Sequence, residues 1–386
     1  MVDMRGTFGI GRIAGVAIRI HWSVAVIFAL IAWSLATVTF PGYYPKEPRW
    51  MHIVAGLTAA VVFLLGLLAH ELSHAVVARR NGVEVDNITL WLLGGVAQLR
   101  GKAGDPGSEL RIAGVGPLVS VLIGLAFGLG TLLLSVAGVS GLLVGAFAWL
   151  AGINLLLAVF NAIPAAPLDG GRLLHAALWK WRGDYVWAAV AAARAGRVLG
   201  FILVLLGLGL FLQTGILSSL WSVLLGWFLA RAASAEEQQV LLDDALQTVR
   251  VRDVMSPEPE TVPADITVAA LIDEYLFQRR HSSFPLVDQD GRLVGLITLR
   301  RIKEVPVALR STTRARDIAC PATEVVTTAP DEPLPELIPR LGLSADGRAL
   351  VLQAGELVGI VSPSDVSQAA QRAMARSHPA SLLRRF

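Results

Sequence analysis

Long apolar runs alternate with short polar segments over the first part of the chain, and the pattern changes after about residue 233. Six runs approach the roughly 20 mainly apolar residues that a membrane-spanning helix needs. They are Trp22 to Phe40, Ile53 to Ala78, Leu110 to Ala137, Gly141 to Ile163, Val198 to Leu212 and Ile216 to Ala230. From Glu236 onward, charged and apolar residues alternate as in a soluble fold. The pattern predicts a polytopic α-helical membrane protein with six spans, followed by a soluble half.

A shorter segment lies between the second and third runs. "NITLWLLGGVAQLRG", Asn87 to Gly101, is too short to cross a bilayer as a helix and is rich in strand-forming residues around Gly94 and Gly95. We expect a short membrane-associated β-hairpin, with a cytosolic surface loop as the alternative. Irregular backbone at membrane depth must be buried in protein or face a water-filled cavity, so a hairpin here indicates a cavity nearby.

The soluble half contains an internal repeat. "VRDVMSPEPETVPADITV" is echoed by "ARDIACPATEVVTTAPDEPL", and "DGRLVGLITLRRI" by "AGELVGIVSPSDV". The pairs Gly295 with Gly359 and Asp253 with Asp317 are each 64 residues apart. Each copy has the pattern of a strand, a helix, two strands around a turn and a closing helix. The repeat predicts two small α/β units that pack as a pseudo-symmetric pair.

These patterns divide the chain into five parts. We expect a membrane domain, a helical linker, two repeat units and a basic tail, at residues 1–234, 235–249, 250–306, 314–371 and 372–386.

Composition and charge agree with a membrane protein. The chain is 54% hydrophobic and 16% charged, with a mean hydropathy of +0.60, which is too apolar for a soluble protein of this size. Arginines and lysines gather at alternate ends of the apolar runs, so the positive-inside rule places both termini and the soluble half in the cytoplasm, with the spans in the cell membrane of a prokaryote. The sequence has no stripe of basic residues with interleaved aromatic residues, so we expect no nucleic-acid partner. Cys320 is the only cysteine, which excludes an intrachain disulfide and permits a reducing compartment.

The second apolar run ends in "HELSH", an unusual sequence for a segment that enters a bilayer. His70 and His74 are four residues apart, so on a helix both rings lie on one face within reach of one ion. Glu71 lies beside the first histidine, where it could accept a proton from a metal-activated water. Charged side chains are costly in hydrocarbon and are functional candidates by default. The alternative is a set of polar residues that face a wet helix bundle.

A catalytic zinc site has three protein ligands and an open position for water, so a third ligand is expected elsewhere. "NAIPAAPLDGGRLLHAAL" places Asp169 after the fourth apolar run, near the same membrane face as His74. Two prolines before Asp169 interrupt a helix, and we expect Gly170 and Gly171 to free the backbone to turn. An ordinary helix N-cap is the alternative for this aspartate.

The two motifs together resemble the paired signatures of the site-2 proteases, which are membrane-embedded zinc metalloproteases. "IRIHW", "LLGGVAQL" and "GVGPLVS" resemble weaker features of that family, so the resemblance covers the whole membrane half. It implies one catalytic Zn²⁺ held by His70, His74 and Asp169, with Glu71 as the general base. It also implies that Asn161 holds the substrate backbone or the developing oxyanion.

The repeated unit resembles a pair of CBS domains, regulatory modules that commonly bind adenine nucleotides such as ATP or AMP. In that family a Ser or Thr, followed three residues later by Asp, contacts the ribose. The second copy has Ser362 and Asp365, whereas the first has Thr298 and Arg301 and lacks the acid. A phosphate ligand, a different ligand or no ligand stays open for the first copy. A structural pair that forms a homodimer through its CBS domains is the alternative for both.

The predicted function is that of an intramembrane zinc endopeptidase in regulated intramembrane proteolysis, modulated by a nucleotide. A helix offers no free carbonyl for attack, so a single-span membrane protein substrate must unwind, and the Gly94-Gly95 hairpin would hold it by strand addition. One alternative is a catalytically inactive membrane scaffold, which would not need Glu71. The other is a CBS-gated metal transporter or channel that uses the HELSH site to bind metal. Such a path needs several intramembrane acids, yet Glu71 is the one acid well inside the predicted spans and Glu109 lies at the edge of the third. His21 and His175 receive no role.

Overall fold

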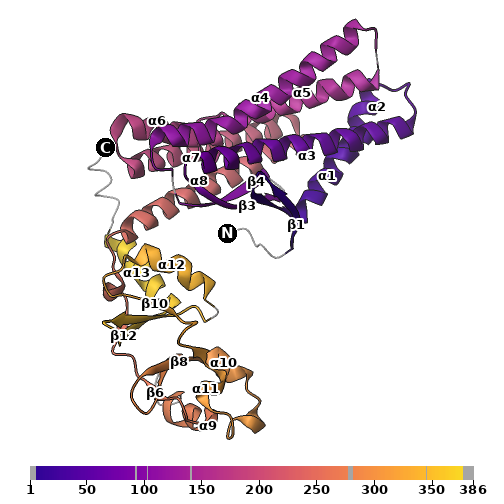
Figure 1. The fold of residues 1–386 in the computed structure, drawn as a ribbon. Coiled ribbons are helices and arrows are strands. Elements are labelled where there is room, and N and C mark those ends of the chain that lie inside the picture. Colours follow the sequence, from indigo (N-terminus) through magenta and orange to yellow (C-terminus); the bar gives the residue numbers. More distant parts are fainter. Residues whose placement is uncertain are drawn as a thin grey trace. The chain divides into compact units, whose positions relative to one another are not determined.

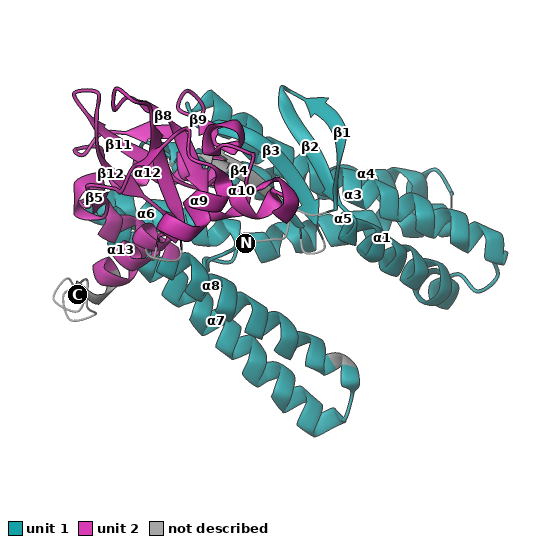
Figure 2. Ribbon diagram, turned by 90° about the horizontal axis from the view of Figure 1, so that it is seen from below, with its two compact units in different colours: residues 1–238 teal, residues 239–386 magenta. Residues whose placement is uncertain are grey.

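The chain folds into two compact units, residues 1–238 and 239–386 (Figure 2). The computed structural model describes residues 6–91, 94–101, 103–139, 141–276, 281–344 and 346–376. Most of the predicted basic tail, residues 377–386, lies outside the described residues.

Long helices make up most of the first unit (Figure 1). Helix α1 (Ser23–Ser34) continues through a π-helical turn, η1 (Leu35–Thr39), into α2 (Phe40–Tyr43). The following helices are α3 (Arg49–Arg80), α4 (Pro106–Val136), α5 (Leu142–Asn161), α6 (Asp169–Arg182), α7 (Tyr185–Thr214) and α8 (Leu220–Leu246), with a 3₁₀ turn, η2 (Leu217–Ser219), before α8.

Five helical segments of the described residues are long and apolar enough to cross a membrane. They are Ser23–Tyr43, Arg49–Arg80, Pro106–Val136, Leu142–Asn161 and Tyr185–Thr214. Large apolar side chains stay exposed along them, as at Leu65, Leu129 and Leu205, which are 58%, 56% and 68% exposed. Apolar surface of this extent on a folded chain indicates contact with lipid. The sixth predicted span falls in η2 and α8, a helix that becomes polar in its second half, and stays a prediction.

Small residues let helices α7 and α8 approach closely. Gly200 and Gly226 face each other, and a Cβ on either glycine would collide with the carbonyl oxygen of the other. Such contacts between small residues are the usual way in which membrane helices associate. The two helices run together away from the bundle of α1, α3, α4 and α5 (Figure 2).

A four-stranded sheet lies beside α3 (Figure 1), in the order β1-β2-β3-β4. Its strands are β1 (Thr7–Ile13), β2 (Val16–His21), β3 (Glu84–Trp91) and β4 (Gly94–Arg100). Strands β3 and β4 pair antiparallel, and β2 joins β3 in parallel. The segment expected as an isolated hairpin is thus half of a larger sheet, in which β4 is an edge strand. Its depth in a membrane stays a prediction.

The second unit holds two four-stranded sheets that exchange strands between the repeats. One sheet has the order β6-β7-β8-β9 and the other β10-β11-β12-β5. The strands are β5 (Ser256–Pro257), β6 (Val262–Pro263), β7 (Ser283–Val287), β8 (Leu293–Thr298), β9 (Cys320–Pro321), β10 (Val326–Thr328), β11 (Ala349–Gln353) and β12 (Glu356–Val361). Strand β9 of the second copy completes the sheet of the first, and β5 of the first completes the sheet of the second. The helices are α9 (Val268–Leu271), α10 (Leu299–Glu304), α11 (Ala315–Ile318), α12 (Leu334–Leu343) and α13 (Pro363–Arg376), with short turns η3 (Val251–Asp253), η4 (Ile272–Leu276) and η5 (Val307–Leu309).

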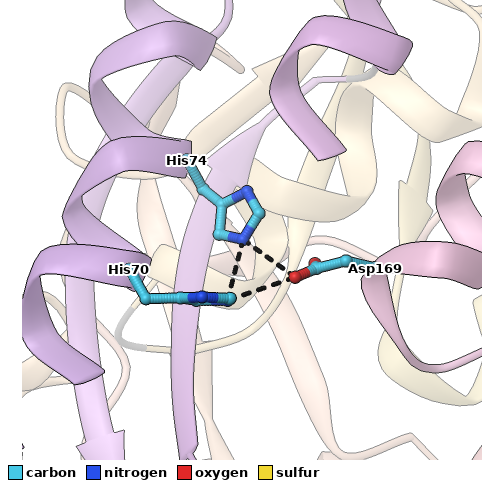
Figure 3. Close-up of side chains that lie close together, drawn as sticks. All are labelled: His70, His74 and Asp169. Carbon is cyan, nitrogen blue, oxygen red and sulfur yellow. Dashed lines mark hydrogen bonds and ion pairs between the residues drawn. The ribbon is translucent and has the colours of Figure 1, made fainter. Parts of the chain in front are cut away.

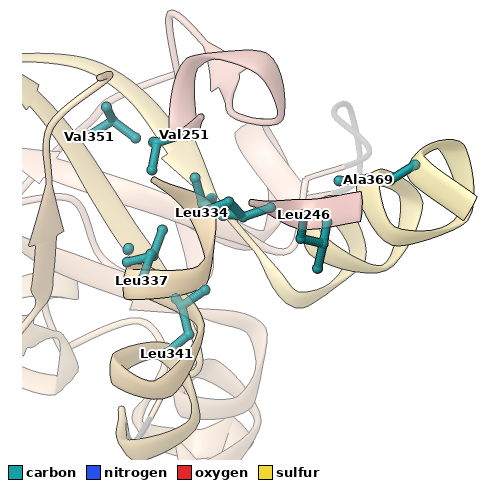
Figure 4. Packing of buried hydrophobic residues seen from close by; sticks show 10 residues of the cluster. Leu246, Val251, Leu334, Leu337, Leu341, Val351 and Ala369 are labelled. Carbon is teal, nitrogen blue, oxygen red and sulfur yellow. The ribbon is translucent and has the colours of Figure 1, made fainter. Parts of the chain in front are cut away.

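Helix α8 ends in the hydrophobic core of the second repeat. Its last residue, Leu246, belongs to a buried cluster with Val251, Leu334, Leu337 and Val351 (Figure 4). Most of the segment expected as a helical linker, residues 235–249, is therefore the second half of α8.

Candidate active site

Three side chains from two helices converge on one point (Figure 3). His70 and His74 lie one turn apart on α3, and Asp169 is the first residue of α6. Asp169 Oδ2 lies 3.1 Å from Nε2 of each histidine, and the two Nε2 atoms are 3.3 Å apart. The side chains are 3%, 8% and 15% exposed in that order. Within the described part of the chain, this is the one set of three His, Cys, Asp or Glu residues close enough to share a metal ion.

The glycines after Asp169 allow close packing rather than an unusual backbone turn. Neither Gly170 nor Gly171 has a positive φ, so the expected conformational reason is wrong. A Cβ on Gly170 would collide with the Ile163 carbonyl, and one on Gly171 with the backbone of Ala166. The start of α6 is therefore pressed against the segment that follows α5, which fixes the position of the aspartate.

The three side chains would fit a zinc ion, both in their chemistry and in the space between them. Two imidazole nitrogens and one carboxylate oxygen are a usual donor set for catalytic zinc. His74 Nδ1 donates to the carbonyl oxygen of Ile112 over 2.6 Å, so its Nε2 keeps a free lone pair on the side of Asp169. A Cβ on Gly116 would lie 2.8 Å from His70 Nε2 and closer still to His74 Nε2. A glycine thus keeps the space between the ligands open.

The remaining predicted site residues line the same cavity as the three ligands, which has a volume of about 480 Å³. Glu71 accepts a hydrogen bond from the backbone N–H of Gly95 over 3.2 Å. A Cβ on Gly95 would collide with Glu71 Cγ, so this glycine makes room for the carboxylate. Gly94 and Asn161, the last residue of α5, also line the cavity.

A second cavity of about 280 Å³ adjoins the first. The two share Leu67, Trp91, Gly94 and Leu157 as lining residues. The second cavity is lined otherwise by aliphatic and aromatic side chains of α1, α3, β3 and α5, with Phe63 and Trp149 among the largest. The polar groups of the site therefore all lie in the first cavity, and the second adds apolar surface beside them.

Three residues of α4 that contact the site received no role from the sequence. Ser120 Oγ lies 2.9 Å from His70 Nδ1, while Ile112 and Gly116 approach the histidines as described. "GVGPLVS" contains both Gly116 and Ser120, so a signal was present, but nothing in the sequence shows which of its residues face α3. The unassigned His21 lies 2.8 Å from Ser23 Oγ.

The CBS-like repeats differ at the two positions expected to contact ribose. In the second copy, the backbone N–H and hydroxyl of Ser362 donate to Asp365 Oδ2 over 2.8 and 2.6 Å. Asp365 lines a cavity of about 700 Å³ at the start of α13, together with Asp253, Arg372 and Asp244.

In the first copy, both of these positions contact a carboxylate from the second copy. Thr298 donates to Asp346 Oδ1 over 3.0 Å, and Arg301 pairs with Oδ2 at 2.9 Å. Arg300 also pairs with Asp346, whose side chain is 3% exposed. Burial alone would raise the pKa of this carboxyl, but the hydrogen bonds from the two arginines and Thr298 lower it below its usual value.

Known protein families match both halves of the chain. The family model for peptidase family M50 matches residues 58–145 and 136–207, and the CBS domain model matches residues 251–308 and 315–372. The Mycobacterium tuberculosis protein Rip3, whose name describes a zinc metalloprotease, is 45% identical over 95% of this chain and 93% of its own length. The zinc metalloprotease MJ0392 of Methanocaldococcus jannaschii is 31% identical over 80% of this chain and 85% of its own length. The solved structure of a site-2 protease from Methanocaldococcus jannaschii is 27% identical and covers 60% of this chain and 95% of that chain, with a TM-score of 0.41.

The family and the apolar helices together indicate an integral membrane protein of a prokaryote. The chain therefore belongs to peptidase family M50, the membrane zinc metalloproteases of the site-2 protease type, and carries a tandem pair of CBS domains.

Proposed function

We propose that this protein is an intramembrane endopeptidase that cleaves the transmembrane segments of single-span regulatory proteins and releases their cytosolic parts. One observation carries the proposal. A glutamate and a cluster of two histidines and an aspartate line one cavity, among helices long and apolar enough to cross a membrane.

The proposed roles follow from the positions of the side chains. Zinc, when bound by His70, His74 and Asp169, would supply Lewis-acid polarisation of a carbonyl and acidification of water. Glu71 follows His70 directly and its carboxylate accepts a hydrogen bond from Gly95 N–H, which supports a role as the base that would accept the proton of the attacking water and pass it to the leaving amine. The side-chain amide of Asn161 would donate to the substrate carbonyl from the end of α5.

The substrate would bind in an extended form, because a helix offers no free carbonyl to a nucleophile. Strand β4 is an edge of the sheet and begins at Gly94, in the cavity wall. Its backbone could pair with an unwound segment by strand addition. The adjoining apolar cavity suits a large apolar side chain of such a segment, since membrane spans consist mainly of such residues.

Zinc content and cleavage, measured in parallel, test the proposal. Wild type and Glu71→Gln are purified at full length and placed in liposomes with single-span membrane proteins, and the products are identified by mass spectrometry. We expect about one zinc per chain in both proteins, as for a single catalytic site of this type, and cleavage inside the transmembrane segment by the wild type. The variant should lose at least about 100-fold in rate, as is typical when a general base is removed. Near-normal turnover by Glu71→Gln, or cleavage confined to extramembrane loops, would refute the mechanism.

We also infer that an adenine nucleotide binds beside Ser362 and Asp365 and alters the cleavage rate. One helix supports a link between the two sites. Leu225, Phe228 and Leu229 of α8 line the catalytic cavity, and Asp244 and Ala245 of the same helix line the cavity at Asp365. A nucleotide changes the rate only if it binds one state of the enzyme better than another.

The proposed membrane topology and oligomeric state are inferred from the amino-acid sequence. The distribution of arginines and lysines favours a cytoplasmic location for both termini and for the CBS pair. A homodimer through the CBS domains is the corresponding proposal for assembly. The transporter alternative needs metal-binding groups along a path, and the described part of the chain brings together a single such group.

A further inference from the structure

One face of α4 contacts the surroundings of all three metal ligands. Glu109, Ile112, Gly116 and Ser120 follow one another at spacings of three, four and four residues, which places them on one side of a helix. All four are buried, and Ser120 is completely so. We call these four residues the α4 face.

Two members of the α4 face meet the outer nitrogens of the histidines. The Ile112 carbonyl accepts from His74 Nδ1, and Ser120 Oγ lies 2.9 Å from His70 Nδ1. A metal-binding imidazole uses one nitrogen for the ion and donates from the other to an oxygen that fixes its tautomer and ring orientation. Because Ser120 is inaccessible to water, no solvent molecule can replace its hydroxyl without a local rearrangement.

Glu109, another member of the α4 face, contacts α6, the helix that carries Asp169. His175 follows Asp169 by six residues on α6, and its Nδ1 lies 2.9 Å from Glu109 Oε1. The other ring nitrogen, Nε2, donates to the Tyr185 carbonyl at the start of α7 over 3.2 Å. Trp179 stacks on the ring with 5.9 Å between centroids. His175 therefore joins α6 to α4 and α7 at one point.

The cost of this arrangement indicates a purpose other than stability. The other oxygen of Glu109, Oε2, is buried and has no hydrogen-bond partner among the described residues. An unsatisfied buried carboxylate oxygen is unfavourable, and well-packed apolar residues at such a pair are often as stable or more stable.

We propose that the α4 face is the template that orients the metal ligands. Ser120 and Ile112 set the tautomers of His70 and His74, Gly116 leaves the ion its space, and Glu109 positions Asp169 through His175. Ser120, Glu109 and His175 are thus positioning residues. These roles concern metal binding, so they can be tested by zinc affinity independently of the proposed substrate.

Replacing the serine tests the histidine part of this proposal. Ser120→Ala is compared with Ser135→Ala on the same helix, where the hydroxyl only donates to the Thr131 carbonyl and faces outward. Zinc affinity is measured by chelator competition on the full-length protein, and ligand geometry by the visible spectrum of the cobalt-substituted form. We expect Ser120→Ala to bind zinc about 10- to 100-fold more weakly, the usual cost of losing such a partner, with a shifted cobalt spectrum. Ser135→Ala should match the wild type. Equal affinities and spectra for all three proteins would overturn the assignment.

Two substitutions at Glu109 test the aspartate part. Glu109→Gln keeps a hydrogen-bonding group beside His175 Nδ1, whereas Glu109→Leu removes it at similar volume. We expect the glutamine variant to keep wild-type zinc affinity and the leucine variant to lose about tenfold or more. Thermal unfolding of the metal-free proteins separates this loss from a general loss of fold. If the leucine variant bound zinc as tightly as wild type, or if the glutamine variant bound as weakly as leucine, the positioning bond would be refuted. Should Glu109→Leu fail to fold, a Glu109→Gln variant that bound zinc more weakly than the wild type would still refute the positioning bond, and the serine pair decides the histidine part.

Discussion

Gly116→Ala should abolish metal binding although it replaces none of the three proposed ligands. The added carbon would lie 2.8 Å from His70 Nε2 and nearer to His74 Nε2, in the space between the two nitrogens. Zinc sits about 2.0–2.1 Å from each nitrogen that binds it, so the methyl group and the ion would compete for one position. Turning the imidazoles away would relieve the clash, but it would also misdirect two of three ligands. Loss of a hydrogen-bonding partner alone weakens zinc about 10- to 100-fold, so we expect a loss above about 100-fold here.

The effect can be measured as metal content and as metal-dependent stability. With zinc at about 1,000 times the wild-type Kd, the ion stabilises the wild type by about 4.1 kcal/mol, and a chain that binds 100-fold more weakly by about 1.4 kcal/mol. The variant should therefore lose about 2.7 kcal/mol of zinc-dependent stabilisation and contain little zinc after dialysis. Elemental analysis and unfolding with and without zinc provide both readouts.

Gly128→Ala is the matched control on α4. A Cβ there would lie 3.9 Å from the nearest atom, Ala151 Cβ, which is an ordinary contact. Because alanine is favoured over glycine inside a helix, this variant should keep its zinc and gain about 0.5–1 kcal/mol in metal-free stability. One zinc per chain at wild-type affinity in Gly116→Ala would refute the reasoning.

Three other expectations concern single residues. Gly95→Ala should displace Glu71, because its Cβ would overlap that carboxylate, and so abolish cleavage while zinc content stays normal; normal cleavage would show that Glu71 does not act from this position. Asp365→Ala should weaken adenine-nucleotide binding in calorimetry and remove any effect of the nucleotide on the cleavage rate. If the wild type bound no nucleotide at millimolar concentration, the CBS pair would instead be a docking or dimerisation module. Asp346→Asn should lower the thermal stability of the CBS pair at pH 7, since a carboxyl with a lowered pKa stabilises the fold above its unfolded pKa of about 3.9. That difference from wild type should shrink as the pH falls below about 4, and a difference that is constant with pH would contradict the role of the charge.

The sequence was most informative where function depends on local spacing. His70 and His74 are one helical turn apart, so any helix over that segment brings their rings together. Asp169 could be anticipated only because zinc needs a third ligand and a short polar motif followed the fourth apolar run. The 64-residue repeat likewise indicated a paired α/β module. The structure adds that the two copies exchange strands β5 and β9 between their sheets.

Features that depend on contacts between residues far apart in the chain could not be predicted from the sequence. Strand β2 pairs with β3 across more than 60 intervening residues, so the predicted hairpin appeared isolated when it is half of a four-stranded sheet. Ser120 and Glu109 look like ordinary residues near the start of an apolar run, and their role appears only when the rotation of α4 against α3 and α6 is known. Asp346 of the second CBS copy pairs with Thr298 and Arg301 of the first copy, a contact that no local motif indicates.

Helix α8 contributes side chains to two cavities of different chemistry, and if it couples nucleotide binding at one to substrate binding at the other, that coupling acts in both directions. Any free energy by which a nucleotide favours or disfavours substrate in the catalytic cavity is a property of both sites, and linkage requires it to be reciprocal. A substrate that Glu71→Gln binds but does not cleave would then shift nucleotide affinity by the same factor by which the nucleotide shifts substrate affinity. The protease would thereby report its load of membrane substrate to the nucleotide site as well as respond to it.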